Sequence, residues 1–285
     1  MLVLPSHIKQ GTKKFTVSLQ RRLGLYVSCA ASYYNAMEAE GNKVTVCDRL
    51  GDTLTHKGNG QTPHKWVCVA WRQAEANATY SQVLLGDKGN GLKYYDDYNN
   101  TYIPDLMVLD DDPRLDEVKN YSSIVHPSTN KAPHNKVTTL NGHEYLMGNT
   151  EERLKHEVLG TRQRNSPALG PFDHRTGLGF IPKHDGDYRD AINNRKASVL
   201  LLVHEIFGGM SLFASRHLRR LGRRAAEEGT DSTDYSQSYT AASFVSYYAQ
   251  RISNNIVMYG ADSFLKQLGK VVKTRAKGRN SASSI

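Results

Sequence analysis

The chain has 285 residues, of which 39% are hydrophobic, which is enough to bury the core of one large domain or two small ones. Lysine and arginine outnumber aspartate and glutamate by 37 to 28, so the net charge of +9 favours polyanionic partners and disfavours acidic ones. Cys29, Cys47 and Cys68 lie far apart and form no CxxC pair, which argues against a disulfide framework and a structural zinc site.

Apolar runs are short throughout the chain. The first run is too short for a secretory signal, and the longest elsewhere, Val199 to Val203, cannot span a bilayer. Together with the cysteine usage, this predicts an intracellular protein, cytoplasmic or nuclear and not secreted, with no membrane role.

The first third of the chain predicts a basic arm followed by a helix and two strands. Residues 1–14 are polar and basic, and apolar residues recur at helical spacing from Thr16 to Glu40, where Gly41 and Asn42 follow. Alternation of apolar and polar residues predicts a strand over 43–48, and the run KWVCVAW predicts another over 65–71.

Two short strands are expected near the middle of the chain. The runs YIPDLMVL, from Tyr102 to Leu109, and LDEVKN, from Leu115 to Asn120, follow a turn-rich stretch and predict two short strands. An acidic turn over 110–113 separates them, so we expect a β-hairpin. A loop-rich insert follows near 125–182, with a helical segment over 151–159.

The last third changes to an alternation of helix, strand and helix. We expect a short helix over 187–194, a buried strand over 198–204 and, after the Gly208-Gly209 turn, a basic helix over 212–228. Strand, turn and helix in succession are typical of α/β proteins.

Two more helices, over 239–259 and 262–272, precede a tail that we expect to be disordered. The predicted organisation is therefore a basic arm (1–14), an α/β core (15–210), a helical extension (211–272) and a disordered basic tail (273–285).

The expected hairpin carries the residues with the most chemical content. Asp105 and Glu117 are twelve residues apart, on neighbouring antiparallel strands if the turn lies over 110–113. Alternation along a strand sends Glu117 and Lys119 to one face and Val118 into the core. Two converging carboxylates can hold Mg²⁺, and Lys119 beside them could position or deprotonate a water.

Pro104-Asp105 followed by Glu117-Val118-Lys119 resembles the motif of the PD-(D/E)xK, or restriction-endonuclease-like, nuclease superfamily. The resemblance covers about residues 17–205. It implies an αβββαβ core with a mixed central sheet and Mg²⁺- or Mn²⁺-dependent phosphodiester hydrolysis, with Asp105, Glu117 and Lys119 catalytic. Such nucleases often add an acidic residue from the first helix, for which Glu38 is the first candidate metal ligand and Glu40 the second.

A second stretch, His204-Glu205-Ile206-Phe207-Gly208-Gly209 with Leu218-Arg219-Arg220-Leu221-Gly222-Arg223-Arg224, is similar to nuclease-like domains encoded by eukaryotic mobile elements. The same helix could bind DNA phosphates through its cations, or simply present a solvated face. The candidate nucleic-acid-binding residues are Arg216, Arg219, Arg220, Arg223 and Arg224.

Together these patterns predict a metal-dependent endonuclease acting on DNA, whose helical extension clamps nucleic acid or the second subunit of a homodimer. One alternative is a non-catalytic nucleic-acid-binding or structural protein of a mobile element or virus. Another is an HNH-type nuclease, for which His134-Asn135-Lys136 is the only hint. The eleven histidines otherwise fit no HxH, HExxH or zinc-finger spacing, so most are expected on loop surfaces.

Overall fold

The structure is a computed structural model. It describes residues 12–51, 54, 61–86, 94–95, 101–110, 113–121, 136–140, 143–147, 154–155, 158–160, 162–163, 165–170, 179–181, 183, 185–229 and 241–282.

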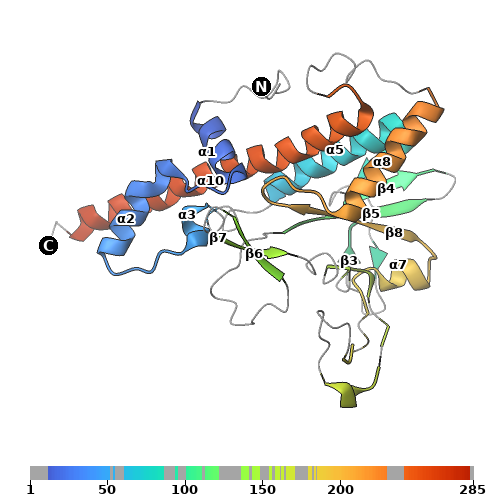
Figure 1. Cartoon of the computed structure of the whole chain (residues 1–285), viewed down its shortest axis with the longest axis horizontal. Coiled ribbons are helices and arrows are strands. Elements are labelled where there is room, and N and C mark those ends of the chain that lie inside the picture. Colours follow the sequence, from blue (N-terminus) through green and yellow to red (C-terminus); the bar gives the residue numbers. More distant parts are fainter. Residues whose placement is uncertain are drawn as a thin grey trace.

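A mixed four-stranded sheet forms the centre of the fold, in the order β1-β4-β5-β8 (Figure 1). Its strands are β1 (Gln82–Leu85), β4 (Leu106–Leu109), β5 (Arg114–Tyr121) and β8 (Ser198–Glu205). β1, β4 and β5 pair antiparallel, and β8 lies parallel to β5. The expected α/β class, the hairpin and the strand after residue 197 are therefore confirmed, although β4 begins only after Pro104 and Asp105.

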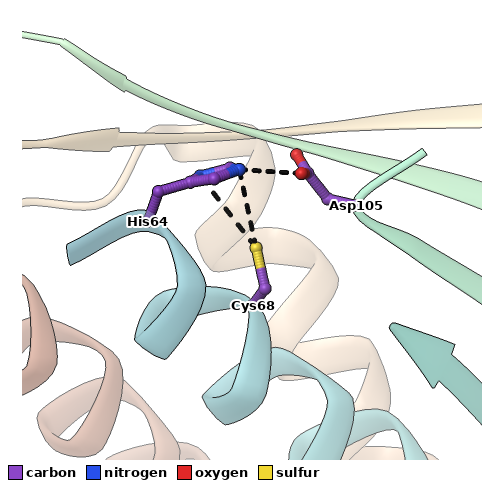
Figure 2. A group of neighbouring side chains, drawn as sticks. All are labelled: His64, Cys68 and Asp105. Atoms are coloured by element: carbon purple, nitrogen blue, oxygen red, sulfur yellow. Dashed lines mark hydrogen bonds and ion pairs between the residues drawn. The ribbon is translucent and has the colours of Figure 1, made fainter. Parts of the chain in front are cut away.

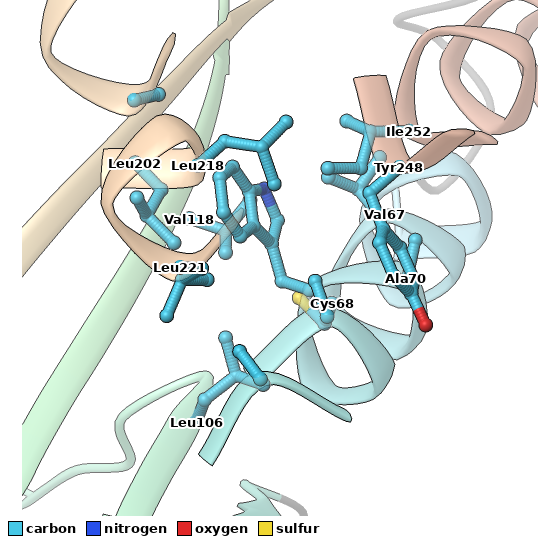
Figure 3. Packing of buried hydrophobic residues seen from close by; sticks show 14 of the residues in the cluster. Val67, Cys68, Ala70, Leu106, Val118, Leu202, Leu218, Leu221, Tyr248 and Ile252 are labelled. Atoms are coloured by element: carbon cyan, nitrogen blue, oxygen red, sulfur yellow. The ribbon is translucent and has the colours of Figure 1, made fainter. Parts of the chain in front are cut away.

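Helices cover both faces of this sheet. One face packs against α5 (Gln61–Thr79), α8 (Leu212–Glu227) and the first half of α10 (Phe244–Ala282). Figure 3 shows how Leu106, Val118 and Leu202 of the sheet meet Leu218 and Leu221 of α8 and the apolar side of α5. The predicted basic helix is thus part of the main core, because its apolar side is buried against the sheet.

The opposite face of the sheet is covered by a smaller cluster. Leu115, Leu201 and Val203 pack there against Tyr188 and Ala191, at the start of and within α7 (Arg189–Asn193). The short helix expected over 187–194 is confirmed. Adjacent strand residues therefore face different layers, which fixes the direction of every side chain on β5.

A third cluster lies away from the sheet, around the second half of α10. There Ala261, Phe264 and Leu268 pack against α1 (Thr12–Arg22), η1 (Ser28–Ala30) and α2 (Ala31–Ala39). In Figure 1, α2 lies beside the C-terminal part of α10 and α1 beside its middle, both away from β4 and β5.

Two strand predictions in the first third were wrong. Residues 46–49 form the helical turn α3 (Val46–Arg49) instead of a strand, because Thr45 and Asp48 cap it reciprocally. Asp48 Oδ2 accepts from the Thr45 N–H at 2.8 Å, and Thr45 Oγ1 accepts from the Asp48 N–H at 3.2 Å.

The run KWVCVAW lies inside α5 rather than in a strand. Val67 and Trp71 belong to a helical stripe that continues through Ala74 and Ala78, all fully buried. This longer period outweighs the local strand preference of two valines.

Helix boundaries also differ from expectation at both ends of the chain. The helix predicted over 16–40 is broken after Arg22, where Gly24 takes a positive φ of 64°. At the other end of the chain, α10 is continuous through Gly260 and ends at Ala282. The predicted break between residues 259 and 262 was therefore wrong, and so was the predicted disorder over residues 273–282. A Cβ at Gly260 would lie 2.4 Å from Arg21 Nη1, so close packing explains this glycine.

A buried polar network joins α5, β5 and α8. Glu75 of α5 accepts from Arg114 Nη2 and pairs with His217 Nε2, both at 2.6 Å. Asp116 accepts from Arg114 Nε at 2.6 Å. Glu75, Asp116 and His217 are at most 2% exposed, so these buried polar groups depend on one another and on Arg114.

Two small hairpins extend the fold. They are β2 (Tyr94–Tyr95) with β3 (Thr101–Tyr102), and β6 (Lys136–Leu140) with β7 (His143–Met147). The second was not expected within the loop-rich insert, which also contains η2 (Pro167–Leu169) and helical residues at 154–155 and 158–159. In the part of the chain that the structure describes, no helix is both long and apolar enough to cross a membrane.

Candidate active site

The β4–β5 hairpin places two acidic residues, Asp105 and Glu117, on neighbouring chain segments. Its register, continued by one residue beyond β4, places Asp105 opposite Glu117. The Gly86 N–H donates to the carbonyl oxygen of Asp105 at 2.9 Å. No side chain fits at Gly86, because a Cβ there would lie 1.7 Å from the carbonyl oxygen of Pro104. The end of β1 therefore holds Asp105 in position.

Both oxygens of the Asp105 carboxylate are engaged. Oδ2 accepts from the Val118 backbone N–H at 2.8 Å, and Oδ1 lies 2.7 Å from Nε2 of His64. The Asp105 side chain keeps 18% of its surface exposed. Asp105 thus faces solvent while being tied to both β5 and α5.

Glu117 is buried between Lys119 and Tyr188. Its Oε1 lies 2.5 Å from Lys119 Nζ, and its Oε2 accepts a hydrogen bond from the Tyr188 hydroxyl. Burial raises the pKa of Glu117, and the negative charge of Asp105 raises it further, against the lowering effect of Lys119 and Tyr188. The charge of Asp105 thus disfavours the ionised form of Glu117, and a cation bound near both carboxylates would offset that repulsion.

Lys119 lies on the same side of β5 as Glu117, as predicted. Val118 points the other way and is 1% exposed within the core against α5. Burial alone would lower the pKa of Lys119, but its attraction to and hydrogen bond with Glu117 outweigh burial and raise the pKa. Lys119 is therefore a positively charged ammonium group beside the Glu117 carboxylate.

The structure places two further potential metal ligands, His64 and Cys68, beside Asp105, and the sequence did not indicate either of them. His64 and Cys68 lie one turn apart on α5, so their side chains share a face. Figure 2 shows both reaching toward Asp105, with the His64 ring beside the Cys68 thiol. Cys68 Sγ lies 3.8 Å from His64 Nε2, and the three donor groups lie within 4.8 Å of one another.

Burial and nearby charge have opposite effects on the pKa of His64, but both raise the pKa of Cys68. Burial would lower the pKa of His64, but the hydrogen bond and charge of Asp105 raise it above its ordinary value. Burial raises the pKa of the Cys68 thiol, and the charges of Asp105 and Glu117 add to the rise. Without a bound cation, Cys68 is a neutral thiol.

The structure does not bring the predicted acidic residue of the first helix to this site. Glu38 lies on α2, where its Oε2 pairs with Arg49 Nη2 at 2.6 Å. Glu40, the second candidate, pairs with Arg275. Because α2 packs near the far end of α10, neither glutamate can complete a metal shell around Asp105 (Figure 1).

The predicted basic face of α8 is largely accessible. Four of its five arginines are exposed: Arg216, Arg219, Arg220 and Arg223. Arg224 is half-buried, 3.5 Å from Asp110 and 3.6 Å from Glu228. His217, within the same basic run, points inward to Glu75 and adds nothing to this face.

A separate cavity of about 540 Å³ lies beside α7, and Glu117 is not among its lining residues. Arg162, Lys183 and Arg189 line it, but Lys183 and Arg189 both pair with Asp185. Its cations are therefore partly neutralised, and none of them contacts the hairpin carboxylates through a bond that the structure records.

His64 and Cys68 were missed because the run around Cys68 was read as a strand. The i, i+4 spacing of a histidine and a cysteine at the start of an amphipathic helix was the available signal. The proposed HNH histidine, His134, and Asn135 lie outside the described residues, and Lys136 begins β6.

No protein-family model, curated protein or solved structure matches this chain significantly. The resemblance to PD-(D/E)xK nucleases and that to mobile-element proteins therefore stay predictions that depend on the motif residues and their geometry.

Proposed function

We propose that the chain is a metal-dependent endonuclease that hydrolyses phosphodiester bonds, with DNA as its substrate. The observation that carries the proposal is that one hairpin sets Asp105 opposite Glu117 and pairs Lys119 with Glu117. The order of elements supports it. α5, the antiparallel strands β1, β4 and β5, then α7 and the parallel strand β8 follow the αβββαβ order of PD-(D/E)xK nucleases. The β2–β3 hairpin is inserted after β1, and the β6–β7 hairpin and η2 are inserted after β5.

The donor set suits a divalent cation. Asp105 and Glu117 offer carboxylate oxygens, the ligands that Mg²⁺ and Mn²⁺ prefer, and His64 offers an imidazole nitrogen beside Asp105. In this proposal His64 takes the place that was expected for Glu38. A bound Mg²⁺ would polarise the phosphoryl group and lower the pKa of a water ligand.

The remaining residues position these groups. Tyr188 and Lys119 each hold one oxygen of Glu117, and the Val118 N–H holds Asp105, so neither carboxylate can rotate freely. Lys119 Nζ, half-buried and cationic, would orient the attacking water and offset charge on the phosphate.

The test is a plasmid-nicking assay with Mg²⁺ or Mn²⁺ and, in parallel, with EDTA. Asp105→Asn and Lys119→Ala should each reduce the rate of nicking roughly 100-fold or more, since each removes a group that acts in the transition state. DNA binding by Lys119→Ala, measured by fluorescence anisotropy without metal, should persist.

Asp262→Asn and Lys266→Ala are matched controls, because this pair lies on the surface of α10, 2.7 Å apart and remote from the hairpin. Both should nick DNA at the wild-type rate. Nicking that survives EDTA, or that is equal in Asp105→Asn and wild type, would refute the hairpin as the active site.

The exposed arginines of α8 favour a second candidate, a non-catalytic nucleic-acid-binding protein. In that case wild-type protein would bind DNA in the anisotropy experiment but leave the plasmid intact with either metal. Asp105→Asn would then bind DNA as the wild type does.

A further inference from the structure

The potential metal ligands beside Asp105 include the sulfur of Cys68, and sulfur is not a ligand that magnesium prefers. His64 Nε2 is 2.7 Å from Asp105 Oδ1 and 3.8 Å from Cys68 Sγ, so one ring nitrogen faces both partners (Figure 2). The helical turn between His64 and Cys68 fixes their spacing. Nitrogen, sulfur and oxygen thus converge on one point from two elements of the fold.

This donor set suits zinc better than magnesium. Imidazole and thiolate are ligands that Zn²⁺ prefers, whereas Mg²⁺ selects oxygen. Ligands about 2.0–2.3 Å from a tetrahedral zinc ion lie roughly 3.3–3.6 Å from one another. The sulfur–nitrogen separation of 3.8 Å already approaches this value, and the sulfur–oxygen separation is no more than 4.8 Å. The nitrogen–oxygen contact would have to widen by about half an ångström.

The cluster is also reachable. Cys68 is buried, but the side chains of His64 and Asp105 keep 31% and 18% of their surfaces exposed. An ion can therefore enter from the side of His64 and Asp105, and a water can fill the fourth position there. Binding would break the S–H bond of Cys68 and the N–H bond that His64 Nε2 directs at Asp105. The thiol proton would go to solvent and the imidazole proton to Nδ1 or to solvent, so that sulfur and nitrogen each bond to zinc without any change in oxidation state.

We infer that His64, Cys68 and Asp105 form a zinc site that draws Asp105 away from Glu117 and so inhibits hydrolysis. In the proposed function Asp105 and His64 are also ligands of the magnesium ion, so a zinc ion held by these two residues and Cys68 would take ligands that magnesium needs. The inhibition rests on the proposed function, whereas the zinc site itself does not.

Zinc binding by the full chain is measured by competition with a colorimetric chelator. Wild-type protein should bind one Zn²⁺ per chain, and Cys68→Ala should bind it at least about tenfold more weakly because one of three protein ligands is lost. Cys29→Ser is the matched control, since Cys29 is a second free thiol on η1. It should bind zinc as wild type does.

Cobalt(II) identifies the ligands directly. The wild-type and Cys29→Ser complexes should show a sulfur-to-cobalt charge-transfer band, which Cys68→Ala should lack. His64→Asn keeps the thiol and changes a half-exposed side chain, so it tests the site even if Cys68→Ala fails to fold; its cobalt affinity should fall at least about tenfold. A band that persists in Cys68→Ala, or unchanged affinity in the folded variants, overturns the zinc site.

A plasmid-nicking assay with added Zn²⁺ tests the inhibition by zinc separately from the nuclease activity itself. With Mg²⁺ present, added Zn²⁺ should inhibit nicking by wild type and Cys29→Ser but not by Cys68→Ala. Equal inhibition of all three overturns the zinc switch. Absence of nicking in every Mg²⁺ or Mn²⁺ reaction overturns the proposed function and the inhibition that rests on it, while the cobalt spectra still decide the metal site.

Discussion

At the scale of single residues, His204 shows how strongly burial controls charge in this core. It is fully buried on β8, where its Nε2 accepts a hydrogen bond from Trp71 Nε1 at 2.8 Å. Burial lowers the pKa of His204 to about 3, and the nearby charge of His64 contributes. His204 is therefore neutral in the folded protein at any ordinary pH.

This residue should make the protein less stable in mild acid. Between the unfolded pKa of about 6.5 and the folded value, only the unfolded chain holds the proton, so the free energy of unfolding falls as pH drops. From pH 7 to 5.5 the loss from this group should be about 1 kcal/mol. In urea denaturation, the unfolding free energy of His204→Gln should fall by about 1 kcal/mol less than that of the wild type between pH 7 and 5.5, whatever its stability at pH 7. Parallel pH profiles for both proteins would contradict the prediction.

At the scale of elements, the Glu75 network ties α5 and α8 to β5. Arg114 is the common partner of Glu75 and Asp116, which come from different elements. The burial of Asp116 raises its pKa to about 6 despite Arg114, so its ionised form depends on that guanidinium. The network thus adds buried polar contacts to the apolar packing that holds α5 and α8 on the sheet.

Removing the shared cation should loosen all three elements together. Arg114→Gln should cost about 3 kcal/mol of unfolding free energy, because it leaves two buried carboxylates without their partner. Arg189→Ala, which breaks an exposed pair with Asp185, should cost only about 0.5 kcal/mol. Guanidinium denaturation measures both. Similar losses for the two variants would show that water replaces Arg114 without penalty.

At the scale of the whole molecule, the exposed side of α8 is the candidate surface for nucleic acid. β5 and β8 are parallel and end at the same edge of the sheet, and α8 follows β8 directly. The first turn of α8 therefore starts near the end of β5 that follows Lys119, while α8 itself covers the face of the sheet opposite to Glu117 and Lys119. A polyanion bound along Arg216, Arg219 and Arg220 would have to extend around this end of the sheet to reach Glu117 and Lys119.

Salt dependence tests this surface. The Arg219→Gln, Arg220→Gln double variant should lower the slope of log affinity against log salt by about 2, since each lost phosphate contact removes roughly 0.9. Lys270→Gln, Lys273→Gln removes the same charge from the far end of α10 and should leave the slope unchanged. Equal slopes for both double variants would mean that net charge, not α8, drives binding.

The sequence alone determined the elements whose signals are local. The hairpin, β8, α7 and α8 each carry a periodicity, a turn or a cap within a few residues, and the pairing of Glu117 with Lys119 follows from alternation on one strand. The readings over 43–48 and 65–71 failed because a reciprocal cap and a longer helical stripe outweighed two short β-like runs.

Only the tertiary structure decided which residues from distant segments meet at the site. His64 lies 41 positions before Asp105, and nothing in the intervening residues specifies that contact. It arises because α5 packs across the sheet with its first turn at the edge where β4 begins. Glu38 was excluded for the same reason, because Gly24 and the packing of α2 against α10 carry it to the other end of the molecule.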